Sequence, residues 1–149
     1  MTDQSLDSFD LDHFSRALVE NIPDAVLYAG KDGRIVYWNA GAERIFGFTA
    51  SEALGQSLDI IIPENLRQRH WDGYEKTVAT GHTRYGSGDL LSVPALRKDG
   101  SRISVEFSML PYFDDQGRMI GIAAILRDAT KQFETVKALR RELAARSKT

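Results

Sequence analysis

Three histidines, His13, His70 and His82, are the side chains of this chain best suited to bind a metal or exchange protons near neutral pH. They are far apart in the sequence and there is no cysteine, so a metal site built from several such residues is disfavoured. The lack of cysteine also excludes disulfides, cysteine nucleophiles and flavin photochemistry through a cysteine adduct. A single histidine therefore remains as the candidate for metal binding or proton exchange.

His70 lies in the segment NLRQRHWDGY, which reads as part of a helix from Pro63 to Thr80 that Gly81 ends. Steps of three and four residues place four side chains on the face of His70: Leu66, Tyr74, Thr77 and Val78. The opposite face carries solvent-type side chains: Arg67, Gln68, Asp72, Glu75 and Lys76. The spacing therefore predicts an inward imidazole.

An inward imidazole has two interpretations. In the first, His70 is a core residue whose ring bonds to a backbone carbonyl or to the hydroxyl of Tyr74. In the second, it is the axial ligand of a haem iron, a role that needs one neutral histidine projecting from a rigid element into an apolar slot.

Composition and motifs argue against an enzyme. The aspartates at positions 24, 32, 99, 114 and 115 fall in turns, and no nucleophile elbow, phosphate-binding loop, HExxH motif or dinucleotide fingerprint is present. The formal net charge of −2 favours neither nucleic acid nor an anionic membrane. Without a signal peptide or a long apolar run, we expect a soluble cytoplasmic protein with no membrane partner.

The local patterns predict an α+β domain with one antiparallel sheet. A helix is expected over Leu11–Asn21 with Asp12 as its N-cap, followed by a strand, a KDG turn and a second strand within residues 22–39. Asn39 and Thr49 suit the caps of two short helices, the second with a capping box through Glu52. Three strands and a last helix complete the pattern: Asp89–Arg97, Arg102–Pro111, Met119–Arg127 and a helix from Thr130.

The stretches IPDAVLYAGKDGRIVYWNAGAERIFGFTASEALGQ, RKDGSRISVEFS and GIAAILRDATKQ resemble the PAS sensor family over about residues 15–135. The resemblance implies a five-stranded antiparallel sheet of order 2-1-5-4-3. Helices pack on one face of that sheet to form a cup for a small cofactor, and further helices flank the domain. The short, polar and acidic start (1–10) is expected to be disordered. The resemblance implies that the sensor domain (11–130) follows, and after it a helix for signalling and dimerisation (131–149).

Within this family, IPENLRQRH resembles the helix of the haem-binding oxygen sensors, which places the proximal ligand on His70. The same resemblance implies propionate partners at Lys76, His82 and Arg84, and a pocket that also involves Leu66, Tyr74, Leu91, Phe107 and Met109. The arginine that holds oxygen in those sensors is not found: an alignment without gaps places Leu91 at its position, and an alignment of the paired glycines places Asp89 there. The resemblance therefore implies a haem b sensor of CO or NO rather than O2. The domain would instead be a redox sensor if Met109 supplied a sixth ligand to the haem iron.

Two alternatives stay open. One is a cofactor-free module that only pairs subunits or partner proteins; the other is a cup for a flavin or a small metabolite. In each case we expect a homodimer through the terminal helices and a signalling protein or domain as output. The basic C-terminal tail lacks a recognition-helix motif, which argues against nucleic acid.

Overall fold

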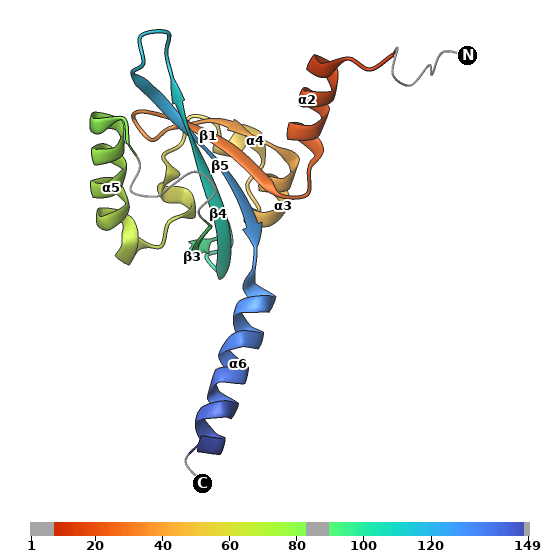
Figure 1. Cartoon of the computed structure of the whole chain (residues 1–149), viewed down its shortest axis with the longest axis vertical. Helices are drawn as coiled ribbons and strands as arrows, with labels where there is room; N and C mark the ends of the chain where they lie inside the picture. Colours follow the sequence, from red (N-terminus) through yellow and green to blue (C-terminus); the bar gives the residue numbers. More distant parts are fainter. Residues whose placement is uncertain (1–7, 83–89, 148–149) are drawn as a thin grey trace.

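A computed structural model describes residues 8–82 and 90–147 of the chain. Its centre is one antiparallel five-stranded sheet with the order β2-β1-β5-β4-β3, as the resemblance implied (Figure 1). The strands are β1 (Ala25–Gly30), β2 (Ile35–Trp38), β3 (Leu91–Leu96), β4 (Arg102–Phe113) and β5 (Met119–Asp128). β4 runs two residues beyond the predicted end at Pro111, because it continues to pair with β5 as far as Phe113.

The helical elements fall into a packed set and a flanking set. The packed set consists of α3 (Ala40–Phe46), α4 (Ala50–Ala53), the 3-10 turns η1 (Leu58–Ile61) and η2 (Glu64–Leu66), and α5 (Arg67–Thr80). The flanking helices α2 (Leu11–Asn21) and α6 (Thr130–Ser147) project away from the sheet in different directions (Figure 1). Within the described ranges, no helix has both the length and the apolar character needed to cross a membrane.

Two of the predicted helix boundaries were wrong. Asp10, not Asp12, caps α2: Asp10 has an extended backbone, and its carboxylate accepts from the amide of Asp12 at 3.2 Å. The predicted helix from Pro63 begins as a 3-10 turn, and the α-helix starts only at Arg67. There the guanidinium of Arg67 donates to the carbonyls of Ile62 and Asp59, which ties the start of α5 back to η1.

The inner face of the sheet and the packed helices enclose the core. Ala25, Leu27 and Ala29 alternate inward on β1 and pair with Leu126, Ala124 and Ile122 of β5. Phe46 of α3 is fully buried against this face. The predicted Asn39 cap and the Thr49–Glu52 capping box are confirmed.

Asn39 is buried and makes four hydrogen bonds. Its Oδ1 accepts from the amides of Val26 (2.8 Å) and Ala42 (2.9 Å), and its Nδ2 donates to the carbonyls of Val19 (2.8 Å) and Asp24 (3.1 Å). One side chain thus joins the end of α2, the start of β1 and the first turn of α3.

Replacing Asn39 with alanine should lower the free energy of unfolding by about 2 kcal/mol, because buried backbone groups lose their partners. Urea denaturation measures this change. Asn21→Ala is the control, since Asn21 is exposed and, among the residues that the structure describes, its side chain bonds to the carbonyl of Ala17 in its own helix. Equal losses in the two variants would contradict the role given to Asn39.

Candidate functional site

His70 lies half-buried on α5, with its Nδ1 atom fully buried. That nitrogen has no hydrogen-bond partner among the described residues. The imidazole packs edge-on against Trp71 (centroids 4.6 Å apart, 78° between planes) and tilted against Tyr74 (5.7 Å, 38°). The inward direction predicted for His70 is therefore confirmed, and a ring nitrogen is left available inside the protein.

Burial determines the protonation state of His70. Desolvation lowers the pKa of its imidazole below the ordinary 6.5, and the negative charge of Asp59 only partly opposes that shift. The ring is consequently neutral at pH 7, which is the form that binds a metal.

This pKa shift predicts a pH-dependent stability. Unfolded His70 takes up a proton below about pH 6.5, whereas folded His70 does so only at lower pH. The unfolded state thus binds more protons, and stability should fall as pH drops from 7 towards 5. Urea melts across this range should show a shallower pH dependence for His70→Phe than for wild type. His13→Gln, at an exposed position of α2, is the control for the loss of a histidine.

Trp71 and Tyr74 fix α5 against the turn between β1 and β2. The indole N–H of Trp71 donates to the carboxylate of Asp59 at 2.7 Å, and its ring occupies the space where a Cβ of Gly33 would be. The hydroxyl of Tyr74 donates to the carbonyl of Gly30 at 2.5 Å. His70 stands between two anchored aromatic side chains, so its ring orientation is set by long-range contacts.

Tyr74 is not the partner of His70. Its hydroxyl is committed to β1, and burial raises the pKa of Tyr74 to about 12. The interpretation of His70 as a core residue whose ring bonds to the hydroxyl of Tyr74 was therefore wrong.

Sequence reasoning missed Trp71. Trp71 lies three residues before Tyr74 and seven before Val78, two residues already placed on the face of His70, and that spacing could have indicated it.

The other predicted apolar residues lie on the core side of the sheet or beside it. Phe107 and Met109 on β4 are half-buried and pack against the same core as Trp71. Leu91 on β3 pairs directly with Phe107, and Leu66 is half-buried at the end of η2. The structure thus gathers aliphatic, aromatic and thioether groups on the sheet face that α5 also packs against.

The predicted polar residues lie elsewhere. Lys76 is on the exposed side of α5, and His82 follows the helix, exposed, with its backbone bonded to the hydroxyl of Thr80. Arg84 lies outside the described residues. Neither Lys76 nor His82 is brought to the imidazole of His70.

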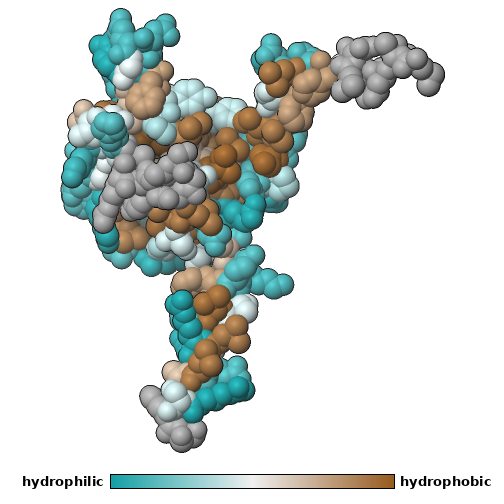
Figure 2. Space-filling model, viewed as in Figure 1, coloured by the Kyte–Doolittle hydropathy of each residue, from teal (hydrophilic) through white to brown (hydrophobic). Residues whose placement is uncertain are grey.

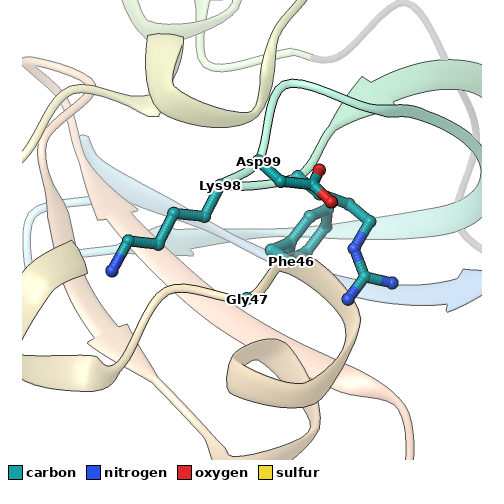
Figure 3. Close-up of a pocket in the computed structure, with 5 residues that line it drawn as sticks. Phe46, Gly47, Lys98 and Asp99 are labelled. Atoms are coloured by element: carbon teal, nitrogen blue, oxygen red, sulfur yellow. The ribbon is translucent and has the colours of Figure 1, made fainter.

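A separate hollow of about 410 Å³ lies on the surface where α3 ends (Figure 3). Its lining residues are Phe46, Gly47, Arg97, Lys98 and Asp99. The backbone amide of Lys98 donates to the carbonyl of Phe46 at 2.8 Å, and the side-chain ammonium of Lys98 pairs with Glu52. The hollow shares no residue with the predicted site.

Known proteins resemble the chain along most of its length. It is 33% identical over 127 residues to an uncharacterised protein of Azorhizobium caulinodans, covering 85% of this chain and 17% of that protein. It is 33% identical over 94 residues to the sensor protein FixL of Bradyrhizobium diazoefficiens, covering 63% of this chain and 18% of that protein. It is 28% identical over 132 residues to the oxygen sensor protein DosP of Escherichia coli, covering 89% of this chain and 16% of that protein. The chain therefore spans about a sixth of the length of the curated relatives it matches.

Solved structures share the fold. A PAS domain from Colwellia psychrerythraea superposes with a TM-score of 0.71 at 22% identity, covering 82% of this chain and 99% of that one. An RNA-binding light-oxygen-voltage receptor superposes with a TM-score of 0.72 at 20% identity, covering 97% and 40%. The family model described as "PAS fold" matches residues 19–133. Since that match takes in the whole sheet, all the packed helices and His70, the chain belongs to the PAS family.

Proposed function

We propose that this PAS sensory domain binds haem b non-covalently with His70 as its axial ligand. The observation that carries the proposal is the buried Nδ1 of His70, which has no hydrogen-bond partner among the described residues. This nitrogen belongs to a neutral imidazole that lies against aromatic and apolar side chains. The similarity to FixL and to the oxygen sensor DosP, together with the IPENLRQRH segment, supports it.

The residues present fit a haem on these grounds. His70 would provide the axial nitrogen, and apolar side chains would line the porphyrin: Leu66, Leu91, Phe107 and Met109. From the family resemblance alone, we propose Lys76, His82 and Arg84 as partners of the propionates. Haem iron, when bound, supplies a position for a diatomic gas and a one-electron couple.

The side chains favour particular ligands. Leu91, Phe107 and Met109 offer no N–H or O–H donor to hold the partial negative charge of bound oxygen, so we propose CO or NO as the gas. The thioether of Met109 as a sixth ligand would instead make the domain a redox sensor.

The proposed output runs through β5 into α6. The carboxylate of Asp128 accepts from the amide (3.0 Å) and the hydroxyl (2.6 Å) of Thr130, and that hydroxyl accepts from the amide of Ser104 at 3.0 Å. These bonds couple the end of the sheet to the start of α6. We propose that the protein acts in the cytoplasm as a homodimer through its terminal helices, with a signalling protein or domain as output.

The test is an absorption spectrum of the purified chain, alone and titrated with hemin. Wild type should give a Soret band that shifts on reduction and with CO. His70→Ala should bind hemin on the order of 100-fold more weakly, because it loses the axial ligand. His13→Ala should match wild type. Equal affinity and an unchanged spectrum in His70→Ala would refute the assignment.

A cofactor-free pairing module is the second candidate. It is favoured by the apolar side chains that both flanking helices expose, among them Phe14 and Leu18 on α2 and Phe133 and Leu139 on α6. Specific dimerisation without any hemin response would select this function.

A further inference from the structure

Both flanking helices join the sheet at the same end. The chain from α2 reaches β1 at Ala25, and β5 passes into α6 after Asp128. β1 and β5 are antiparallel neighbours, and the register places Ala25 opposite Leu126. Figure 2 shows hydrophobic side chains along both α2 and α6, so each helix offers a partner an apolar surface through which it can be moved.

The last residues of β5 are held by a neighbouring strand on one side only. The pairing of β5 with β1 ends at Leu126, whereas its pairing with β4 continues to Asp128. The amide of Ala129 then donates to the carbonyl of Ser104 on β4 at 2.8 Å. The ladder between β1 and β5 therefore stops before the chain enters α6.

An ion pair continues the contact on the side of β1. The guanidinium of Arg127 donates to the carboxylate of Asp24 through Nε at 3.4 Å and through a terminal nitrogen at 3.3 Å. Asp24 is itself held in place, because its carbonyl accepts from the buried Asn39, which also binds the carbonyl of Val19 in the last turn of α2. The ion pair thus joins the end of α2 to the end of β5.

A second acidic side chain lies close to Arg127. Glu106 is directly opposite Arg127 in the register of β4 and β5, so both side chains are on the same face of the sheet, with their Cβ atoms about 5 Å apart. The hydrogen bonds and charge of Asp24, and after them the charge of Glu106, raise the pKa of the Arg127 guanidinium. A guanidinium that turns from Asp24 to Glu106 leaves the end of β5 held by β4 alone.

We propose that Arg127 is a two-position latch between the flanking helices. Paired with Asp24, it ties the direction of α6 to that of α2; paired with Glu106, it lets α6 move with β4. A partner that displaces α2 thereby shifts α6 without involving His70, so the latch goes beyond the proposed haem function and does not depend on a cofactor. Exposed ion pairs stabilise only weakly, so a bound partner can change the position of the latch.

Two spin labels test the latch in the whole chain. The chain has no cysteine, so Arg16→Cys on α2 and Arg140→Cys on α6 provide the labelling sites, and both positions are exposed. Pulsed electron paramagnetic resonance measures the distance between the labels. An excess of unlabelled chain restricts the signal to distances within one chain, and no cofactor is added.

Wild type should give one main distance. Asp24→Asn and Arg127→Gln should each lower the ratio of this distance to all others about threefold, because each change breaks the ion pair. Asp24→Arg combined with Arg127→Asp restores a pair of opposite charges and should restore the main distance. Glu106→Gln removes the second position, so the main distance should be at least as populated as in wild type.

Arg118→Gln is the matched control. It breaks the ion pair of Arg118 with Asp114, which is similarly exposed and lies at the other end of β4 and β5, and it should leave the distances unchanged. The latch is overturned by a wild type without a main distance, by unchanged distances in Arg127→Gln, or by an equal change in Arg118→Gln. A loss of the main distance in Glu106→Gln overturns it as well. Failure of wild type to bind hemin would remove the proposed cofactor but leave these distances standing.

Discussion

Gly41→Ala should destabilise the protein by about 3 kcal/mol or more and leave little folded chain at physiological temperature. Gly41 lies in the first turn of α3, where a Cβ would stand 2.0 Å from the carbonyl oxygen of Asp24 and 2.8 Å from that of Pro23. Both obstacles are backbone atoms held by the bonds to Asn39 and Arg44, so they have little freedom to withdraw.

Gly73→Ala is the matched control. It is also a helical glycine, but a Cβ there meets nothing within 4 Å. Alanine has the higher helix propensity, so this variant should gain about 0.5–1 kcal/mol. Chemical denaturation of the two variants measures the difference, and similar stabilities would contradict the close contact between α3 and the start of β1.

Gly33→Ala should cost about 3 kcal/mol and also disturb the site around His70. Gly33 has φ +78°, and a Cβ there would lie 2.1 Å from the ring of Trp71. The indole must move, which breaks its bond to Asp59 and releases the edge-on contact with His70. We therefore expect hemin affinity to fall about tenfold as well.

The control for Gly33→Ala is Gly117→Ala. Gly117 has φ +79°, but nothing lies within 4 Å of a Cβ there, so this variant should show only the backbone strain of about 1 kcal/mol and normal hemin binding. Denaturation and hemin titration of both variants separate the contact with Trp71 from the strain that the two positions share. Equal effects at both positions would show that Trp71 does not hold His70.

Local sequence determined most of the elements of this protein. Helical spacing placed His70 inward, Thr49 and Glu52 formed their capping box, and the strands appeared close to where alternation predicted them. These features depend on residues a few positions apart, so the sequence is sufficient to predict them. The order of the strands was available only through the resemblance to a known family.

Tertiary structure alone decided the surroundings of His70. Trp71 bonds to Asp59 twelve residues away, and Tyr74 bonds to Gly30 forty-four residues away. Neither a periodicity nor a capping rule relates such distant positions, because their contacts arise only when the turn after β1, η1 and α5 meet. Spacing in the sequence therefore determined the inward direction of His70, and long-range packing decided what surrounds its imidazole.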